Sequence, residues 1–363
     1  MTDGGIDSRN RALRYRHVGL GELEPPARIS PAWDRIEGML IALAIGDSLG
    51  NPTESRLPSS RFSEYGEIRE YVPNWHAEDR PVGLPSDDSQ LAFWTLERLL
   101  GDGRVDPERL ADTFASRRIF GIGKSMRGFV AARKAGSPWY EAGQHSAGNG
   151  AVMRIAPVIL PHLDKPTSAL WQDAVVAGAV THNDASSIGA CVAMTGILWE
   201  LLGMDGPPRP EWWIDTYCRR ARPLEGDVQL TPRHEELARE FRGPIWQLLE
   251  SHVRPALRDQ LPVREACNRW YSGAYLLETI PSAIYILARH ADDPEEAIVR
   301  AVNDTKDNDT VAAIVGAAVG ALHGAEALPA RWKSGLLGRT REDDDGRVFE
   351  LIEAARERWG RDL

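Results

Sequence analysis

The chain has 363 residues, 42% of them hydrophobic, so it is long and apolar enough to bury a large core. Its formal net charge is −10, from 53 acidic and 43 basic side chains. This surplus of negative charge repels a phosphate backbone, so we expect no nucleic-acid partner.

The cysteines and the apolar segments indicate where the protein works. Cys191, Cys218 and Cys267 show no metal-ligand spacing, which predicts unpaired thiols in a reducing compartment. The first 24 residues lack the apolar stretch of a signal peptide. The longest apolar run near the C-terminus, residues 311–322, is too short to span a bilayer. We therefore expect a cytoplasmic protein without membrane association.

Residues 1–32 differ in composition from the rest of the chain. They carry many charges, few large apolar residues, and prolines at 25, 26 and 31. This composition predicts a charged N-terminal extension outside the core, either flexible or available to bind a partner. Residues 33–363 show no clear break in composition and no fixed-period repeat, which predicts one domain.

The core begins with a helix from Trp33, whose apolar residues recur at helical spacing up to residues 46–50. Residues 51–85 contain five prolines and are expected to form a long irregular stretch, which in compact domains is usually functional or disordered. Ser86 then occupies the N-cap position of a new helix. Asp106-Pro107 is a start signal for another.

The remaining chain is dominated by helical periodicity. Further helices are predicted at residues 169–179, 185–202, 235–249, 281–289, 294–302, 310–323 and 347–358. Alternation of period two is nearly absent, and only residues 65–72 are a candidate for a short strand. The sequence therefore predicts an all-α fold of many helices in a single compact domain.

The first acidic cluster is Ser86-Asp87-Asp88-Ser89. Carboxylates at a helix start are stabilised by the macrodipole, which is a sufficient structural explanation for them. Adjacent helical side chains leave the axis about 100° apart, so both cannot point at one spot. They could still flank one metal or serve two, with the Ser86 hydroxyl as a further oxygen ligand.

The second acidic cluster contains Asp304, Asp307, Asp309 and Thr310. It directly precedes residues 311–320, which are small and apolar, so the helix they form must be buried and closely packed. Within it Gly316 and Gly320 lie one turn apart, which allows another backbone to approach. Carboxylates at the mouth of a buried helix need compensation, and a metal ion is a common form of it.

Three smaller features are weaker signals. Residues 148–154 place two glycines around Asn149, a pattern that suits either a plain turn or a nest of N–H groups for a diphosphate. His182 precedes a helix, where a lone histidine is more often a structural hydrogen-bonding group. Glu54 adds an acid shortly after the Gly46-Asp47 pair.

Taken in order, these segments resemble the ADP-ribosylglycohydrolase family, which includes the dinitrogenase-reductase-activating glycohydrolases. The matching segments are residues 46–50 with Glu54, residues 86–90, residues 148–154, Thr181-His182, and residues 307–310 with the Ala/Gly-rich helix. They span most of the core and keep the order of the family.

The resemblance implies an all-helical domain with a cleft for two divalent cations, Mg²⁺ or Mn²⁺. The positions that match the family's metal ligands are Ser86, Asp87, Asp88, Asp307, Asp309 and Thr310. It implies that Glu54 reaches the metal region, and we assign catalytic roles to Glu54, Asp88 and Asp307. It also implies that Asn149, Gly150 and His182 bind the ADP-ribose.

The implied function is hydrolysis of ADP-ribose from a modified protein, first of all at the N-glycosidic bond to arginine. O-linked ADP-ribose is an alternative substrate. A second alternative is an immunity protein that blocks an ADP-ribosyltransferase toxin through residues 1–32, with or without hydrolysis.

The chain departs from the family at two points. Thr305-Lys306 replaces the usual Gly-Gly before the second acidic motif, which puts the choice of substrate in doubt. Ser86 stands where the family often has Thr, and keeps the hydroxyl.

Overall fold

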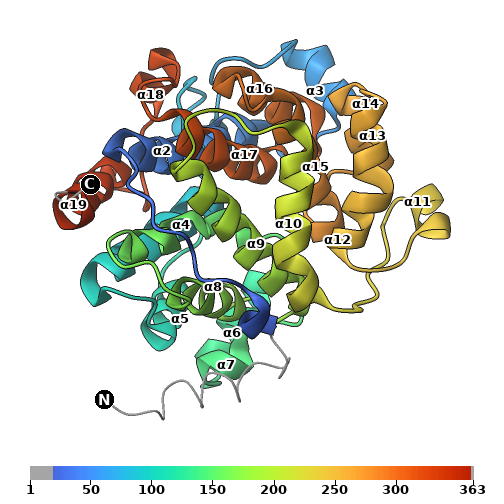
Figure 1. Ribbon diagram of the computed structural model, residues 1–363. Helices are drawn as coiled ribbons and strands as arrows, with labels where there is room; N and C mark the ends of the chain where they lie inside the picture. Colours follow the sequence, from blue (N-terminus) through green and yellow to red (C-terminus); the bar gives the residue numbers. More distant parts are fainter. Residues whose placement is uncertain (1–18, 361–363) are drawn as a thin grey trace.

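The computed structural model describes residues 19–360, and these are helices joined by loops, with isolated β-bridges but no extended strand (Figure 1). The all-α prediction is therefore confirmed. The α-helices are α2 (Trp33–Gly50), α3 (Pro58–Tyr65), α4 (Asp87–Asp102), α5 (Pro107–Ser116), α6 (Lys124–Lys134), α7 (Trp139–Ala142), α8 (Ala169–Ala179), α9 (Ala185–Leu202), α10 (Pro210–Glu225), α11 (Glu235–Glu240), α12 (Ile245–Leu248), α13 (Arg254–Arg258), α14 (Val263–Arg269), α15 (Leu276–His290), α16 (Pro294–Asp304), α17 (Asn308–His323), α18 (Ala330–Gly335) and α19 (Arg347–Trp359).

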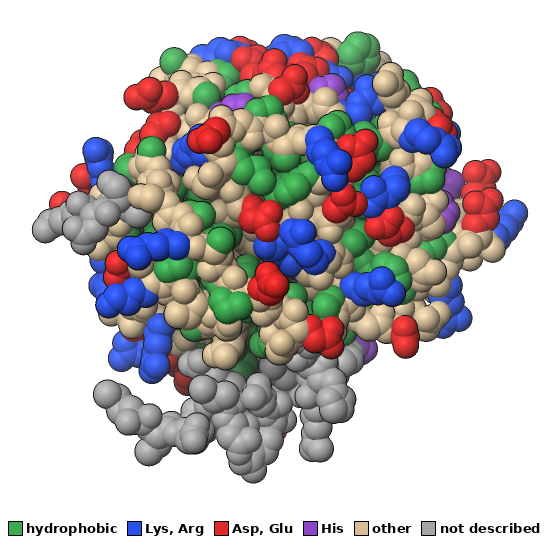
Figure 2. Space-filling model, in the orientation of Figure 1, with side chains coloured by type: hydrophobic (Ala, Val, Ile, Leu, Met, Phe, Trp, Pro, Cys, Tyr) green, Lys and Arg blue, Asp and Glu red, His purple; other side chains and the backbone are tan. Residues whose placement is uncertain are grey.

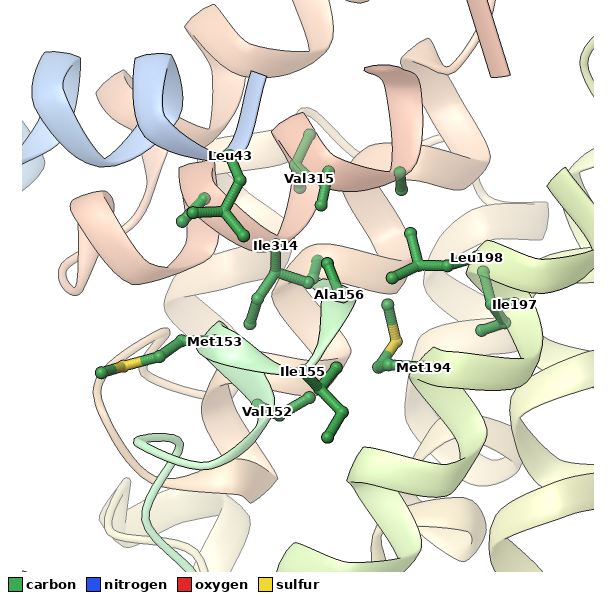
Figure 3. Close-up of a cluster of buried hydrophobic side chains, with 14 of the residues drawn as sticks. Leu43, Val152, Met153, Ile155, Ala156, Met194, Ile197, Leu198, Ile314 and Val315 are labelled. Carbon is green, nitrogen blue, oxygen red and sulfur yellow. The ribbon is translucent and has the colours of Figure 1, made fainter. Parts of the chain in front are cut away.

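Helices α2 and α17 lie side by side in the middle of the fold, although they come from opposite ends of the chain (Figure 1). Their buried side chains meet the short 3₁₀ segments η4 (Val152–Arg154) and η5 (Ala156–His162) and helix α9. Figure 3 shows Leu43 of α2 and Ile314 of α17 in one apolar cluster with Ile155 and Met194. One core therefore connects the first, middle and last thirds of the chain.

The contact between α2 and α17 is made backbone to backbone. A Cβ on Gly316 would lie 2.2 Å from the Ala42 carbonyl oxygen, and one on Gly46 would lie 2.1 Å from the Ala312 carbonyl oxygen. A Cβ on Gly320 would lie 2.1 Å from the carbonyl oxygen of Gly38. Because real Cβ atoms do not approach so closely, these positions require glycine. The close approach predicted at Gly316 and Gly320 is confirmed.

Several predicted boundaries agree with the structure and some do not. Helices α8 and α9 have the predicted bounds, and Asp106 caps α5 by accepting a hydrogen bond from the Arg109 N–H. The helix predicted at residues 235–249 is wrong as one element, because α11 ends at Glu240 and α12 begins at Ile245, after Gly243-Pro244.

The region before Ser86 also differs from the prediction. The strand at residues 65–72 is wrong, since Tyr65 ends a helix and the following residues are irregular. The stretch 51–85 is not wholly irregular, because Pro58 starts the eight-residue helix α3. Proline is favourable at the first position of a helix. The prediction counted Pro58 only as a residue that breaks helices and so missed this start.

The described half of the N-terminal extension lies on the core. Indole N–H groups of Trp171 in α8 and Trp199 in α9 each donate a 2.9 Å hydrogen bond, to the carbonyl oxygens of Glu24 and Ala27 respectively. Ile29 packs against Gly203, at the end of α9. The segment 19–32 is thus held against α8 and α9 by these contacts. Residues 1–18 of the predicted extension lie outside the described residues.

Helix α9 is long and apolar enough to cross a membrane, with a mean hydropathy of 1.5 over 18 residues, but 94% of it is buried inside the protein. It therefore has the environment of a core helix. Cys191, on this helix, is free and buried, as are Cys218 and Cys267. On the face drawn in Figure 2, acidic and basic side chains are interspersed.

The helix contact gives a stability prediction. Replacing Gly316 with Val should destabilise the protein by about 3 kcal/mol or more, because α2 has to move away from α17. The control is Gly101→Ala at an exposed position in the last turn of α4, where the nearest atom to a new Cβ is 3.6 Å away. That change should be neutral or stabilising by up to about 1 kcal/mol. Urea unfolding midpoints measure both, and equal midpoints for the two variants would contradict the proposed contact.

Candidate metal centre and active site

The two predicted acidic clusters meet in one cleft, together with the end of α2. Carboxylate oxygens of Asp47, Asp88 and Asp309 lie within 4.8 Å of one another. Those of Glu54, Asp307 and Asp309 form a second group with the same spacing. Asp309 belongs to both groups, so the structure places two three-carboxylate sites side by side.

The packing of helix termini explains why these carboxylates converge. Asp47 lies in the last turn of α2, while Asp88 and Asp309 lie in the first turns of α4 and α17. Gly50 lets α2 approach the start of α17, since a Cβ there would lie 2.4 Å from the Asp309 Cα. The positive ends of the α4 and α17 dipoles partly offset the negative charge of their acids.

Asp47 is a buried acid that the sequence analysis did not select as a site residue. Its carboxylate accepts hydrogen bonds from the backbone N–H of Ser86 (2.9 Å) and of Ser89 (3.0 Å). It also accepts from the Ser86 hydroxyl (2.6 Å) and the Ser89 hydroxyl (2.5 Å). Asp47 thus caps α4 from a different helix and fixes the backbone that carries Asp87 and Asp88. An acid directly after the uncharged, mostly apolar run of residues 38–46 was the available signal.

Ser86 is at the predicted N-cap of α4, but its hydroxyl makes no capping bond within that helix. The hydroxyl donates to Asp47 at 2.6 Å and lies 3.5 Å from Oδ2 of Asp88, and Ser86 is not among the residues that line the cleft. The side chains of Asp87 and Asp88 point in different directions, as expected for neighbouring residues in a helix. Asp88 joins a three-carboxylate group, and Asp87 lines the same cleft from outside both groups.

The cluster has the features expected of a cation site. In the part of the chain that the structure describes, Oδ1 of Asp88 is buried and accepts no hydrogen bond. None of the six carboxylates, including Asp87, forms an ion pair with a residue between 19 and 360. Hard oxygen ligands of this kind suit Mg²⁺ or Mn²⁺, so the residues present fit a divalent metal.

Burial and mutual repulsion act on these acids in the same direction. Burial is the largest cause that raises the pKa of Asp88 and Asp309 well above the usual range, followed by neighbouring carboxylates. Burial and the charge of Glu54 raise the pKa of Asp307 to about 7. The metal-free cluster therefore holds protons that a divalent cation would displace.

The loop that contains Asn149 reaches the second carboxylate group. The Asn149 side-chain amide donates hydrogen bonds to Oδ2 of Asp307 and to the Thr279 hydroxyl (3.0 Å). The backbone N–H of Asn149 donates to the Ala274 carbonyl at 3.2 Å. The side chain predicted to bind ADP-ribose is thus directed at a predicted metal ligand, while Gly150 and His182 line the cleft beside it.

Thr305-Lys306, where the chain departs from the family, faces away from the cleft. The Thr305 hydroxyl donates to the Ala301 carbonyl at 2.7 Å and closes the end of α16. The Lys306 ammonium lies 3.2 Å from the centroid of the Tyr271 ring, a cation–π contact. Lys306 is absent from the residues that line the cleft, and its charge contacts the Tyr271 ring.

The cleft has a volume of about 250 Å³ and is bounded on one side by the carboxylates. It brings together all the predicted site residues except Ser86. The lining residues that were predicted are Glu54, Asp87, Asp88, Asn149, Gly150, His182, Asp307, Asp309 and Thr310. Lys124, Ser125 and Gly121 line it as well and were not predicted from the sequence.

Comparison with known proteins identifies the family. The sequence pattern described as ADP-ribosylglycohydrolase matches residues 28–361. This chain belongs to the ADP-ribosylglycohydrolase family. The family is one of hydrolases that act on glycosidic bonds, and the cleft is the candidate active site.

Named relatives span most of both chains. An ADP-ribosylarginine hydrolase Tri1 from Pseudomonas putida is 25% identical, over 83% of this chain and 74% of the relative. The ADP-ribosyl-[dinitrogen reductase] glycohydrolase of Rhodospirillum rubrum is 25% identical, over 84% of this chain and 90% of the relative. The ADP-ribosylhydrolase ARH3 of Homo sapiens is 26% identical, over 85% and 91%.

The fold is also that of a solved structure. A chain described as an ADP-ribosylglycohydrolase-related protein complex superposes with a TM-score of 0.66 and 25% identity. The superposition covers 91% of this chain and 99% of the other.

The position of Asp47 predicts a loss of metal affinity on substitution. Asp47→Asn keeps the shape but turns one acceptor oxygen into a donor that faces the N–H groups of α4. Divalent cation affinity should fall by about 10–100-fold, as is typical when support for metal ligands is removed. Calorimetric titration with Mn²⁺ measures this, with exposed Asp164→Asn as the control. Unchanged affinity in Asp47→Asn would show that the bonds to Ser86 and Ser89 do not position the ligands.

The raised pKa of Asp307 predicts how stability depends on pH. Because this pKa is about 7 in the fold and near 3.8 ordinarily, the folded protein binds the proton more tightly than the unfolded chain does. The contribution of this protonated carboxyl group to stability is complete below about pH 3.8, and it is lost as the pH rises through about 7. In chelator, the Tm should therefore fall between about pH 5 and about pH 8.

Added Mn²⁺ should reverse this trend and raise the Tm most at the alkaline end, because cation and protons compete. Asp307→Asn in chelator should have a flatter profile than the unaltered protein. Differential scanning calorimetry across the range distinguishes these outcomes. A chelated protein whose Tm rises with pH in this interval would contradict the assignment.

Proposed function

We propose that this protein hydrolyses the N-glycosidic bond between ADP-ribose and an arginine side chain of a modified protein, with two divalent cations as cofactors. The observation that carries the proposal is the pair of three-carboxylate groups that share Asp309, of which Glu54, Asp88, Asp307 and Asp309 line one cleft. Two of the relatives named above act, by their names, on ADP-ribosylarginine or on ADP-ribosylated dinitrogen reductase. Mg²⁺ is the first choice and Mn²⁺ the second.

The cations, when bound, would supply positive charge for the ribose hydroxyls and lower the pKa of water. The proposed ligands are Asp88, Asp307 and Asp309, with Asp87 and Thr310 at the same cleft, while Asp47 supports them through its hydrogen bonds to Ser86 and Ser89. Asn149 orients Asp307 through its side-chain amide.

The reaction breaks the bond between ribose C1″ and the guanidino nitrogen, and a water oxygen bonds to C1″. The proton that the water loses ends on the leaving nitrogen. Glu54 is our candidate for this proton transfer, because it is the exposed member of its carboxylate group, at the mouth of the cleft. Burial of its carboxyl end and the charge of Asp47 raise the pKa of Glu54, which favours a carboxyl group able to hold a proton.

O-linked ADP-ribose is the alternative substrate. Blocking of a transferase toxin through residues 1–32 is less favoured, because residues 19–32 direct their contacts to their own core. The three free, buried cysteines agree with the proposed cytoplasmic location.

The test is mass-spectrometric detection of free ADP-ribose after the protein and Mg²⁺ are mixed with an arginine-ADP-ribosylated protein. Asp88→Ala, Asp307→Ala and Asp309→Ala should each reduce release to background, because each removes a proposed ligand. The control is Asp164→Ala, an exposed acid far along the surface, which should keep full activity.

A parallel reaction with a serine-ADP-ribosylated peptide separates the two linkages. If free ADP-ribose were released only from the serine-linked peptide, the substrate would be O-linked ADP-ribose and not ADP-ribosylarginine. Full release in metal-free buffer with chelator would rule out the metal-dependent scheme.

A further inference from the structure

A chain of three buried side chains lies behind the Gly148–Gly150 loop. Nη2 of Arg154 donates to the Thr181 hydroxyl oxygen at 2.6 Å, and that oxygen lies 2.9 Å from Nδ1 of His182. Thr181 and His182 are 0% and 2% exposed. The other ring nitrogen, Nε2, has no hydrogen-bond partner in residues 19–360, and His182 lines the cleft.

The direction of every hydrogen bond in this chain follows from Arg154. A guanidinium can only donate, so the Thr181 oxygen accepts from it. The hydroxyl proton then needs its own acceptor, and within the described residues Nδ1 of His182 is the one at hydrogen-bonding distance. Nδ1 is therefore without a proton, and the proton of the neutral ring is on Nε2.

The other protonation states leave buried groups unsatisfied. If Nδ1 of His182 carried a proton, the Thr181 oxygen would accept from both Arg154 and Nδ1, and the buried hydroxyl proton would have no acceptor among the described residues. A doubly protonated ring has the same conflict and adds a second positive charge near Arg154. In agreement, burial and then Arg154 lower the pKa of His182 to about 3.

Arg154 connects the Gly148–Gly150 loop to the last turn of α8. Its guanidinium donates to the carbonyl oxygens of Gly150 and of Ala177, the latter at 3.1 Å, and none of the described carboxylates pairs with it. Gly150 leaves room for the ring, because a Cβ there would lie 2.9 Å from the Cε1 atom of His182. The imidazole is therefore fixed in position as well as in protonation.

We propose that Arg154 and Thr181 are positioning residues that keep His182 neutral, with the Nε2–H group offered to the cleft as a hydrogen-bond donor. The group that accepts this bond would be a phosphate or ribose oxygen of the ligand, a statement that rests on the proposed function. The protonation state itself does not rest on it. His182 is then a constant donor near neutral pH and takes no part in proton transfer.

The direct test is two-bond ¹H–¹⁵N NMR on protein with ¹⁵N-labelled histidine, in which the cross-peak pattern identifies the protonated nitrogen. The chain has nine histidines, so His182→Gln assigns the signal. The expected pattern is the Nε2–H tautomer from about pH 5.5 to about pH 8.5 without titration. Thr181→Ser keeps the hydroxyl and should keep the pattern, whereas Thr181→Val should lose the preference for one tautomer.

Activity provides the second measurement. Thr181→Val should raise the KM for the modified protein about tenfold and change kcat little, as expected for a lost hydrogen bond to bound ligand. Thr181→Ser should stay within about twofold of the unaltered protein. Mn²⁺ titration of both variants checks that the metal centre is intact.

An Nδ1–H ring, a titration near pH 6.5, or an unchanged tautomer in Thr181→Val would each overturn the inference. A protein that shows the expected tautomer but releases no ADP-ribose would instead refute the proposed function alone.

Discussion

The geometry of the candidate active site depends on the backbone contact between α2 and α17. At Gly38, Gly46, Gly316 and Gly320 the two helices approach more closely than any side chain allows, and they run antiparallel, so the end of α2 faces the start of α17. Carboxylates repel one another when buried together, as the raised pKa values in the cleft show. The apolar contact along two long helices supplies the stability that holds these like charges near one another in the absence of a cation.

Helix α4 joins this pair through hydrogen bonds and not through apolar contact alone. Asp47 accepts from the N–H and hydroxyl groups of Ser86 and Ser89, so one carboxylate aligns the first turn of another helix. Asp88, two residues after Ser86, is thereby placed against Asp309. The serine of the first acidic motif thus connects two helices, a role that explains why a hydroxyl is needed there even though it does not line the cleft.

The sequence was informative where local pattern decides the structure. Helices α8 and α9 follow from continuous apolar periodicity and clear ends, and the motif order located the acids of the cleft. Tertiary contacts decided the rest. The role of Asp47 depends on where α4 lies, and residues 19–32 are held by indole groups more than 140 positions away in the chain. The interruption at Gly243-Pro244 has a local signal in the proline, which apolar periodicity overlooked, and the pairing of Gly243 with Leu230 accompanies it.

The substitution of Thr305-Lys306 for the family's Gly-Gly can now be interpreted physically. Two glycines would leave the turn before Asp307 free of side chains, whereas here Thr305 caps α16 and Lys306 covers the ring of Tyr271. The turn is also held by the N–H groups of Lys306 and Asp307, which donate to the Ser272 carbonyl at 3.1 and 3.0 Å. Neither side chain lines the cleft, so the departure adds two side chains to the turn before Asp307 without adding one to the cleft. We therefore expect Thr305 and Lys306 to act through the position of this turn and not through a direct contact with the carboxylates.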